Sequence, residues 1–417
     1  MSGDGVVIVG AGQAGVGVAA ALREQDFTGR IALVGKEPHP PYERPPLSKA
    51  YLGAAPVDDA HLGLRTPTWY VERDVALHLG REVEDIDRHA RVVTLDDGRR
   101  LPYDHLVLAT GTRARTLPVD GADLDGVMVL RGLDDARALR RHLDRARTVL
   151  TIGAGFIGLE VAAAAHRRGV HPVVVDVASR VMERAVTPTT STYFAQAHRG
   201  WGTELFLETG VEALRGRHGL VSTAVLTSGQ QVPVDLVVMA VGVAPDTRLA
   251  AGAGLATDDG VVVDEHLVTS DAAISAVGDC ARFPEPISGR PARLESVQAA
   301  TDHARCVAAR IVGDPAPYRA VPWFWTHQGD LKLQIAGLGG GIDTEIVRGD
   351  PAARKFSVFG FRDDRLATVE SVNRPADHVA ARRLLAASAA PTPEQVADPD
   401  TDLKGLAASA AAVAAAS

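Results

Sequence analysis

The stretch VVIVGAGQAG, residues 6–15, decides the fold of the N-terminal part of the chain. Four β-branched residues run into a turn that contains three glycines, and an alanine-rich stretch follows. This order predicts a buried parallel strand, a tight turn and a helix over about residues 13–25, before a second strand at 30–34. Such a βαβ motif is typical of a dinucleotide site, because its glycines let the backbone approach a pyrophosphate at the start of the helix.

The same pattern occurs a second time, about 140 residues further along, as TVLTIGAGFIG at residues 148–158. A helix over about 156–168 and a strand over 171–176 should complete this second βαβ motif. A lone GxGxxG is a weak signal, but each copy here follows a strand and opens a helix. Two motifs predict two dinucleotide sites. Their glycines are Gly10, Gly12 and Gly15 in the first motif and Gly153, Gly155 and Gly158 in the second.

Two further apolar strands return to these motifs and set the domain organisation. They are YDHLVLATGTRAR at 103–115 and VDLVVMAVGVAPD at 234–246. From about Tyr318 the sequence becomes aromatic and alternating, which predicts an antiparallel C-terminal domain with a hairpin at 362–365. The predicted domains are a discontinuous FAD-binding domain at 1–113 and 243–318, an NAD-binding domain at 114–242, a C-terminal α+β domain at 319–403 and an alanine-rich tail at 404–417.

Composition narrows the classes of partner. The chain of 417 residues is 46% hydrophobic with a formal net charge of −8, which argues against nucleic acid or an anionic membrane as the principal partner. No stretch has the length and hydropathy of a membrane span. The two cysteines, Cys280 and Cys306, form no CxxC and no cluster with histidine. We therefore expect no metal site and a reducing, cytoplasmic location.

An acidic residue about 20 positions beyond each glycine turn is expected to accept hydrogen bonds from a ribose. The candidates are Glu37 in the first motif and Asp176 in the second. Lys36 occupies a strand-end position where an acid would be equally plausible, and a solvated charge pair is the alternative for Lys36 and Glu37. Since a carboxylate would repel the extra phosphate of NADPH, Asp176 predicts NADH as the donor.

Two dinucleotide sites on one chain favour a tightly held, non-covalent FAD together with a nicotinamide that comes and goes. Many reductases with this pair of sites carry a redox cysteine shortly after the first motif, but residues 38–60 contain none. Dithiol and peroxide chemistry are therefore disfavoured. Cys280 and Cys306 are interpreted as inert packed thiols.

Six motifs in a fixed order identify a family. They are RPPLSKAYL at 44–52, ATG at 109–111, GAGFIGLE at 153–160, VGDCARF at 277–283, ESVQAATDHAR at 295–305 and PWFWTHQ at 322–328. In this order they resemble the oxygenase-coupled, NADH-dependent ferredoxin reductases, over residues 4 to 380 and beyond. The resemblance implies an α/β fold of the glutathione-reductase type, with two Rossmann-like dinucleotide-binding domains and a C-terminal α+β domain.

The resemblance also implies roles for individual residues. Lys49 would lie next to the hydride-accepting flavin nitrogen with Glu160 as its charge partner, and Trp325 would lie by the flavin face. Asp279 would bond the ribityl chain and Val297 would approach the ring edge. The other implied cofactor contacts are Ala14 and Gly15 at the pyrophosphate, Lys36 or Glu37 at the adenosine ribose, Arg44 along the FAD, Val83 at the adenine, Arg131, Thr110 and Gly111 of the ATG motif, Phe156 and Ile157 of the second turn, and Gly242 of the returning strand.

The function implied is transfer of a hydride from NADH to FAD, followed by single electrons to a 2Fe-2S ferredoxin that supplies a cytochrome P-450 or a ring-hydroxylating oxygenase. Alternatives are a rubredoxin reductase, an NADH oxidase without its cysteine, and a flavoprotein in which NADH switches conformation. The sequence departs from the family pattern at Lys36, which is usually an acid, and at Thr326 and His327, which are usually Ser-Asp. Arg65, Arg305 and Arg310 are candidate contacts for an acidic ferredoxin, with solvated surface charge as the alternative.

Overall fold

The structure is a computed structural model that describes residues 5–53, 55, 57–285, 289–387 and 391–408. It divides into two compact units, each built from three separate stretches of chain. Unit 1 consists of Met1–Glu43, Asp58–Arg113 and Val243–Pro322, and unit 2 of Arg44–Val57, Ala114–Gly242 and Trp323–Ser417. The segment 44–57 therefore groups with unit 2. The boundaries of the four predicted segments stay predictions.

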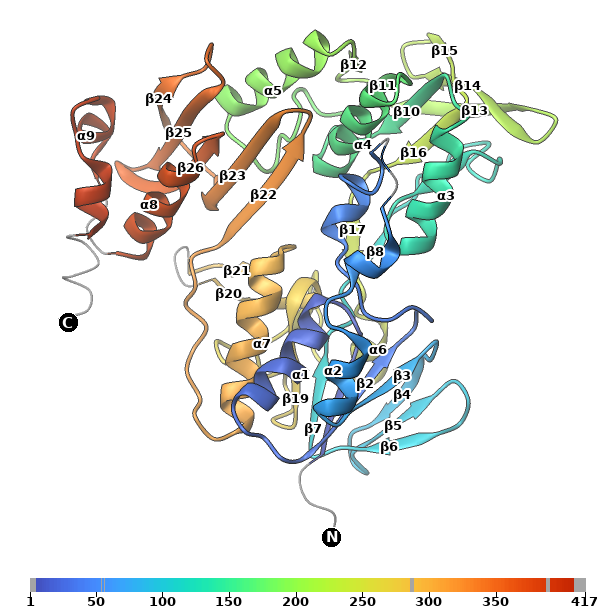
Figure 1. Ribbon diagram of the computed structural model, residues 1–417, viewed down its shortest axis with the longest axis vertical. Helices are drawn as coiled ribbons and strands as arrows, with labels where there is room; N and C mark the ends of the chain where they lie inside the picture. Colours follow the sequence, from blue (N-terminus) through green and yellow to red (C-terminus); the bar gives the residue numbers. More distant parts are fainter. Residues whose placement is uncertain (1–4, 54, 56, 286–288, 388–390, 409–417) are drawn as a thin grey trace. The chain divides into compact units, whose positions relative to one another are not determined.

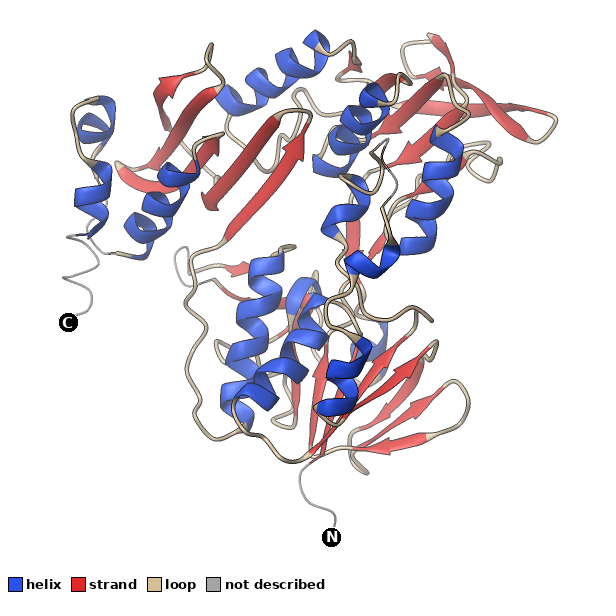
Figure 2. Cartoon of the chain, viewed as in Figure 1, coloured by secondary structure: helices blue, strands red, loops and turns tan. Residues whose placement is uncertain are grey.

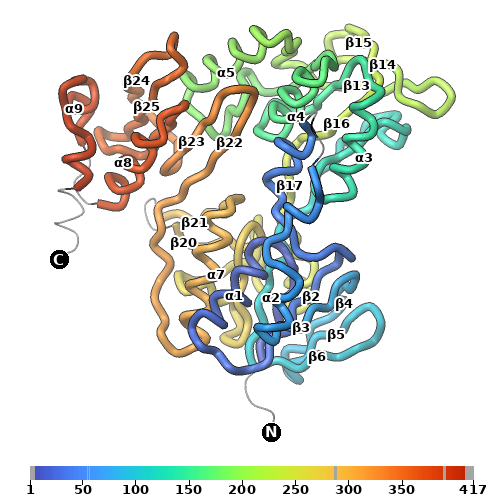
Figure 3. The backbone as a smooth tube through the Cα atoms, in the orientation of Figure 1, coloured from blue at the N-terminus to red at the C-terminus, as the bar shows by residue number. Residues whose placement is uncertain are grey.

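Unit 1 is organised around a parallel sheet whose strand order is β19-β7-β1-β2-β3. The first motif supplies the central strand β1 and the helix α1, which begins at Gln13 as predicted. Helices α1 and α7 lie side by side (Figures 1 and 3). The bounds are β1 (Gly5–Val9), α1 (Gln13–Glu24), β2 (Arg30–Gly35), β3 (Val75–Leu79), β7 (His105–Leu108), β19 (Ile274–Ala276) and α7 (Val297–Ile311).

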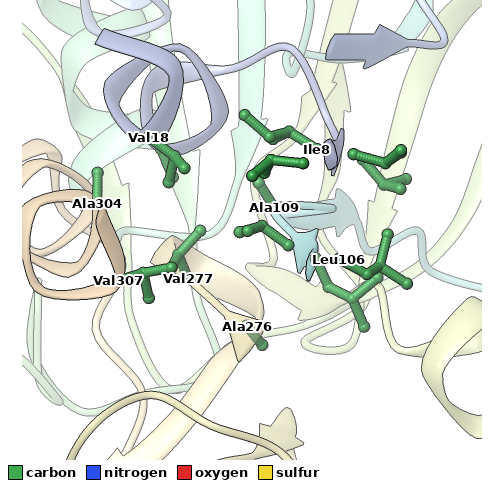
Figure 4. Close-up of a cluster of buried hydrophobic side chains, with 14 of the residues drawn as sticks. Ile8, Val18, Leu106, Ala109, Ala276, Val277, Ala304 and Val307 are labelled. Carbon is green, nitrogen blue, oxygen red and sulfur yellow. The ribbon is translucent and has the colours of Figure 1, made fainter. Parts of the chain in front are cut away.

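The core of unit 1 forms where these helices meet the sheet. Ile8 and Leu106 from neighbouring strands are fully buried, as are Val18 of α1 and Val307 of α7 (Figure 4). Burying an aliphatic side chain of this size stabilises the fold by about 1.5–3 kcal/mol. The continuous apolar run of β1 is thus explained by burial on both faces of a parallel sheet.

The remaining elements of unit 1 form smaller sheets and short helices. An antiparallel sheet has the order β4-β5-β6, and a smaller one has the order β18-β20-β21. The bounds are η2 (Asp59–Leu62), α2 (Pro67–Glu72), β4 (Val83–Asp87), β5 (Val92–Leu95), β6 (Arg100–Pro102), β8 (Thr112–Ala114), β17 (Val243–Pro245), α6 (Arg248–Gly252), β18 (Val261–Val262), η3 (Gly278–Cys280), β20 (Ala281–Pro284) and β21 (Pro291–Ala292).

Unit 2 contains the second parallel sheet, with the order β12-β11-β10-β16-β9. The second motif supplies β10, the helix α4 and β11, so both predicted βαβ motifs are confirmed. An antiparallel meander, β13-β14-β15, accompanies this sheet. The bounds are β9 (Val127–Val129), α3 (Leu133–Leu143), β10 (Thr148–Ile152), α4 (Phe156–Arg167), β11 (His171–Val175), α5 (Pro188–Gly200), β12 (Glu204–Phe206), β13 (Val211–Arg217), β14 (Leu220–Leu226), β15 (Gln231–Pro233) and β16 (Leu236–Met239).

The C-terminal part of unit 2 is an antiparallel sheet of order β22-β23-β26-β25-β24, with α8 packed on it (Figure 2). The predicted hairpin is confirmed, since β25 ends at Arg362 and β26 begins at Arg365. Most of the predicted tail, residues 409–417, lies outside the described residues. The bounds are β22 (Trp323–Gln328), β23 (Leu331–Gly337), β24 (Thr344–Asp350), β25 (Lys355–Arg362), β26 (Arg365–Val372), α8 (Pro375–Ala386) and α9 (Pro393–Ala397).

Candidate functional site

The first glycine turn has the geometry of a pyrophosphate cradle. The Gly10 amide donates to Val34 O at 2.8 Å, which closes the turn against β2. A Cβ on Gly10 would lie only 2.1 Å from Ala109 O, so the close approach requires glycine. A Cβ on Gly12, by contrast, would meet no described atom within 4 Å. The N-terminus of α1 therefore faces open space, as an anion-binding helix start requires.

The second turn repeats this geometry atom for atom. The Gly153 amide donates to Val175 O at 2.8 Å, and a Cβ on Gly153 would lie 2.4 Å from Ala240 O. Gly155, at the N-cap of α4, again has no described atom within 4 Å of its Cβ position. Ile157 is 40% exposed beside it. Both turns thus fit a dinucleotide pyrophosphate.

Several predicted cofactor residues of unit 1 gather beside the first turn. A Cβ on Gly278 would lie 2.9 Å from Ala14 Cβ, which places the turn containing Asp279 directly against the start of α1. His303 Nδ1 accepts from the Gly278 amide at 3.1 Å. Val297 is the first residue of α7, whose N-cap is Ser296. The turn containing Asp279 and the N-terminus of α1 therefore lie together beside the first glycine turn.

The two candidate ribose contacts of the first motif, Lys36 and Glu37, have different partners. Lys36 Nζ lies 2.8 Å from Glu82 Oε2, and the Lys36 side chain is 68% exposed. Glu37 instead accepts a hydrogen bond from the Tyr42 hydroxyl. Val83, at the start of β4, follows Glu82 directly. These contacts favour Glu37 over Lys36 as the ribose contact, although both stay predictions.

The candidate catalytic pair lies wholly within unit 2. Lys49 Nζ lies 2.9 Å from Glu160 Oε1 and 3.0 Å from Glu160 Oε2. Only 1% of the Glu160 side chain and 15% of the Lys49 side chain are exposed. Glu160 accepts further bonds from the Ser48 hydroxyl and, at 2.5 Å, from Thr326 Oγ1. A buried carboxylate needs such partners, because an unpaired buried charge is very costly.

The other predicted residues of unit 2 have contacts within that unit. Arg44 Nη1 donates to Arg131 O at 2.8 Å. Trp325 lies in β22, next to Thr326, and its ring centroid is 5.5 Å from that of Trp323. Phe156 packs on Phe324 with a centroid distance of 4.7 Å. The start of α4 is thereby attached to β22.

The loops that end the two returning strands carry the remaining candidates. Thr110 Oγ1 donates to Asp246 O at 2.6 Å, and the Asp246 amide donates to Gly111 O at 2.9 Å. Gly242 follows β16 in the same way that Gly111 follows β7. Each of these residues therefore lies at the carboxyl end of a parallel sheet, where dinucleotides bind in open α/β folds.

Asp176 is held rigidly at the end of β11. Its Oδ2 accepts from the Ala154 amide at 2.6 Å and its Oδ1 from the Ala178 amide at 2.9 Å. A carboxylate has about four lone-pair sites, so two remain for a ribose. Arg180, the nearest basic residue in sequence, donates to Val186 O and Glu183 O at 2.8 and 2.7 Å. Its guanidinium is thus committed to the protein backbone.

Sequence reasoning missed the residues that hold the Lys49 segment. Two arginines bind its backbone: Arg140 donates to Tyr51 O at 2.7 Å, and Arg168 donates to Gly53 O at 2.7 Å. The Arg168 side chain is 8% exposed and also pairs with Asp144. Arginine donors in α3 and after α4 have no local signature that would connect them with residues 51–53.

One sequence expectation in this segment is wrong. A serine that follows two prolines predicts a helix that begins at Ser48, whereas Ser48 ends a short 3-10 helix, η1 (Pro45–Ser48). The two prolines fix the φ angles that begin this turn, and Lys49 leaves it with φ −115 and ψ −103. The Ser48 hydroxyl is consequently free to point at Glu160 rather than to cap a helix.

Neither cysteine has the environment of a redox thiol. Complete burial raises the pKa of Cys280, and burial raises the pKa of Cys306 to about 11. A reactive thiol needs the opposite shift. Within the described ranges, no group of three or more His, Cys, Asp or Glu side chains has the arrangement of a metal site. No described helix has the length and hydropathy to cross a membrane.

Comparison with known proteins places this geometry in a family. The model of the pyridine nucleotide-disulphide oxidoreductases matches residues 4–304, and a second model, reductase C-terminal, matches residues 323–407. The chain belongs to the pyridine nucleotide-disulphide oxidoreductase family. Family members are FAD-dependent and use NAD(H). The predicted fold class and the predicted cofactors are confirmed.

Three members of this family illustrate the similarity. Rhodocoxin reductase of Rhodococcus erythropolis is 48% identical over 399 residues, covering 96% of this chain and 93% of that protein. The anthranilate 1,2-dioxygenase system ferredoxin–NAD(+) reductase component of Burkholderia cepacia is 42% identical, covering 97% of this chain and 99% of that protein. The crystal structure of the ferredoxin reductase for the CYP199A2 system from Rhodopseudomonas palustris superposes with a TM-score of 0.95, at 47% identity, over 97% of this chain and all of that one.

Proposed function

We propose that this oxidoreductase takes a hydride from NADH and passes electrons singly to a 2Fe-2S ferredoxin, which supplies a cytochrome P-450 or another oxygenase. The observation that carries the proposal is the buried Lys49–Glu160 pair on a chain with two dinucleotide turns and no cysteine at 38–60. The absence of cysteine from that stretch leaves no residue there for a dithiol relay. The three relatives described above, two of them named as ferredoxin reductases, support the choice of acceptor.

Binding of NADH is assigned to the second turn and Asp176. The open N-terminus of α4 attracts the pyrophosphate, and the carboxylate accepts from the ribose hydroxyls with its two remaining lone pairs. Because both carboxylate oxygens are fixed by backbone amides, Asp176 cannot turn away from an added phosphate. The Arg180 guanidinium is held by the Val186 and Glu183 carbonyls, which restrains it from reorienting toward that phosphate. Both features favour NADH over NADPH.

Hydride arrival is assigned to the Lys49 ammonium. Bound FAD supplies the chemistry that accepts a hydride and releases electrons one at a time. The protein contributes a cation held by a buried carboxylate, and a preformed charge of this kind costs no reorganisation during the reaction. Ser48 and the arginines on the Lys49 segment fix where that cation lies. Trp325 is assigned to the flavin face.

The proposed contacts follow the sequence analysis residue by residue. For FAD they are Gly10, Gly12, Ala14, Gly15, Lys36 or Glu37, Arg44, Lys49, Val83, Thr110, Gly111, Arg131, Asp279, Val297 and Trp325. For the nicotinamide nucleotide they are Gly153, Gly155, Phe156, Ile157, Gly158, Glu160, Asp176 and Gly242. A cytoplasmic location is part of the proposal and is supported by the two free cysteines.

The proposal is tested by an acceptor panel. Purified, FAD-loaded protein is given NADH and, separately, several 2Fe-2S ferredoxins, a rubredoxin, a small disulfide substrate and oxygen. We expect at least one ferredoxin to be reduced at least about tenfold faster than any other acceptor. Faster reduction of the rubredoxin or of oxygen would replace the ferredoxin assignment. Reduction of the disulfide would refute the interpretation of the cysteines as inert thiols.

A further inference from the structure

A chain of buried polar side chains extends from Glu160 into the C-terminal sheet. Thr326 Oγ1 lies 2.5 Å from Glu160 Oε1, Gln328 Nε2 lies 3.3 Å from Thr326 Oγ1, and His198 Nε2 lies 2.9 Å from Gln328 Oε1. Thr326, Gln328 and His198 are each 0% exposed. All belong to unit 2, in which β22 contributes two of them and α5 the third.

The direction of every bond in this chain is determined. Glu160 pairs with the Lys49 ammonium, so its carboxylate oxygens only accept hydrogen bonds. Thr326 must therefore donate its single hydroxyl proton to Glu160 Oε1. Thr326 can then only accept from Gln328, which turns the amide oxygen of Gln328 toward His198. Hence His198 carries its proton on Nε2.

The state of His198 agrees with this direction. Burial lowers the pKa of His198 to about 4, so the ring is neutral and carries one N–H near neutral pH. Its other nitrogen, Nδ1, then carries no proton and can accept from the Thr203 hydroxyl, whose Oγ1 lies 3.5 Å away. All three donors therefore point toward Glu160, and each bond polarises the next.

We propose that Thr326, Gln328 and His198 are positioning residues for hydride transfer, which orient the Glu160 carboxylate and through it the Lys49 ammonium. Strand β22 alternates: Thr326 and Gln328 are buried, whereas Trp325 is half-buried and His327 exposed. One strand thus holds the charge pair with one face and carries the Trp325 ring on the other. The inference rests on the assignment of Lys49 to hydride arrival and not on the identity of the acceptor.

The first test is the rate of flavin reduction by NADH in anaerobic stopped flow, a step that needs no ferredoxin. Thr326→Val removes the donor at nearly constant volume and is expected to slow reduction roughly 5- to 30-fold at saturating NADH, with the Kd for NADH changed less than about twofold. Thr326→Ser should restore most of the rate. The matched control is Thr368→Val, because Thr368 is an equally buried threonine of the same sheet whose hydroxyl donates to Ala336 O.

A double-mutant cycle separates positioning from a general structural effect. In a Lys49→Met background, Thr326→Val should cost no further rate, because its effect passes through that ammonium. A cost that multiplies in the double variant, or an unchanged rate in folded, FAD-loaded Thr326→Val, overturns the proposal. Failure of the ferredoxin assignment would leave this result intact, since no ferredoxin takes part.

The second test begins with a measurement that does not depend on activity. In histidine-labelled holoenzyme, heteronuclear NMR should report His198 as a neutral ring protonated on Nε2 over the range from pH 6 to 8, with Gln328→Leu shifting that resonance. Gln328→Leu should also slow flavin reduction, by roughly two- to fivefold, which is less than Thr326→Val because Gln328 lies one hydrogen bond further from Glu160. A proton on Nδ1 of His198 would reverse the chain and contradict the proposal even if the Thr326 variant failed to fold.

Discussion

The Lys49 ammonium lies 2.9 Å from Glu160 Oε1, across 111 residues of sequence. The carboxylate is buried and is surrounded by hydroxyl donors from two other stretches of chain. A cation held in this way is fixed before the substrate arrives. Its position therefore depends on three distant segments folding together, which makes the pair sensitive to changes outside the glycine turns.

Replacement of Lys49 tests the role of the charge. Lys49→Met should slow flavin reduction by at least about tenfold and change NADH affinity much less, because the ammonium acts where the hydride arrives. Stability should also fall by about 3–5 kcal/mol, since Glu160 is left buried without its cation. Stopped-flow reduction and chemical denaturation measure the two effects. Lys355→Met, on an exposed residue of β25, is the control, and an unaltered reduction rate in Lys49→Met would make Lys49 structural.

Asp176 should set the choice of nicotinamide. Efficiency with NADPH is expected to be roughly ten-fold to several hundred-fold lower than with NADH, equivalent to about 1.4–3.5 kcal/mol. Asp176→Ala should narrow the difference in efficiency between the two donors, because it weakens NADH binding and relieves the repulsion of the extra phosphate of NADPH. Arg180→Ala is the control and should leave the ratio unchanged, because that guanidinium binds backbone carbonyls. Equal kcat/KM for the two donors in the unmodified enzyme would remove Asp176 as the ribose ligand.

Glu370 predicts a pH dependence of stability. It is 0% exposed, its two oxygens lie 2.7 and 2.8 Å from Thr187 N and Oγ1 at the start of α5, and burial raises its pKa to about 7 from 4.5. Between pH 4.5 and about 7, the Glu370 carboxyl is thus protonated in the folded state and ionised in the unfolded state. Its contribution to stability is complete below about pH 4.5 and is lost as the pH rises through 7, on the order of 3 kcal/mol.

Glu370→Gln should remove this slope. Denaturation curves between pH 5 and 8 would show the variant gaining stability relative to the parent as the pH rises. Glu212→Gln, an exposed residue of β13, should track the parent at every pH. A parent whose stability rises over the same interval by the amount attributed to Glu370 would show that its carboxyl is ionised in the folded state.

A docking surface for an acidic ferredoxin should include Arg305 rather than Arg310. Arg305 is 68% exposed, while Arg310 Nη2 donates to Ser275 Oγ at 2.7 Å. Arg305→Glu should lower the rate of ferredoxin reduction several-fold at low salt, and the difference should shrink as salt is added. NADH-to-ferricyanide turnover reports the flavin alone and should not change. Arg217→Glu, on the β13–β14 hairpin, controls for net charge, and an equal effect in both variants would argue against a specific contact.

The sequence predicted what depends on local pattern. The helix start at Gln13, the strand at Arg30 and the turn between Arg362 and Arg365 all follow from periodicity, glycine placement and turn residues. The geometry of the two glycine turns was predictable for the same reason, because consecutive residues form each turn.

Contacts between residues far apart in the chain could not be predicted from local sequence pattern. The sequence around Thr326 and His198 does not show that a chain of hydrogen bonds links them to Glu160. A threonine in a strand or a histidine in a helix is ordinarily structural. Local pattern wrongly predicts a helix start at Ser48, because a serine after two prolines fits an N-cap, whereas Ser48 ends η1. In the structure the Ser48 hydroxyl instead donates to Glu160, which sequence pattern alone could not place nearby.

The most direct test of the central claim is a stoichiometric titration of a 2Fe-2S ferredoxin with NADH under anaerobic conditions, with catalytic amounts of this enzyme. Each NADH carries two electrons and each cluster accepts one, so two ferredoxin molecules should be reduced per NADH, as followed by the cluster's absorbance and its electron paramagnetic resonance signal. A ferredoxin panel that stays oxidised while the same enzyme readily passes electrons from NADH to ferricyanide would contradict the account.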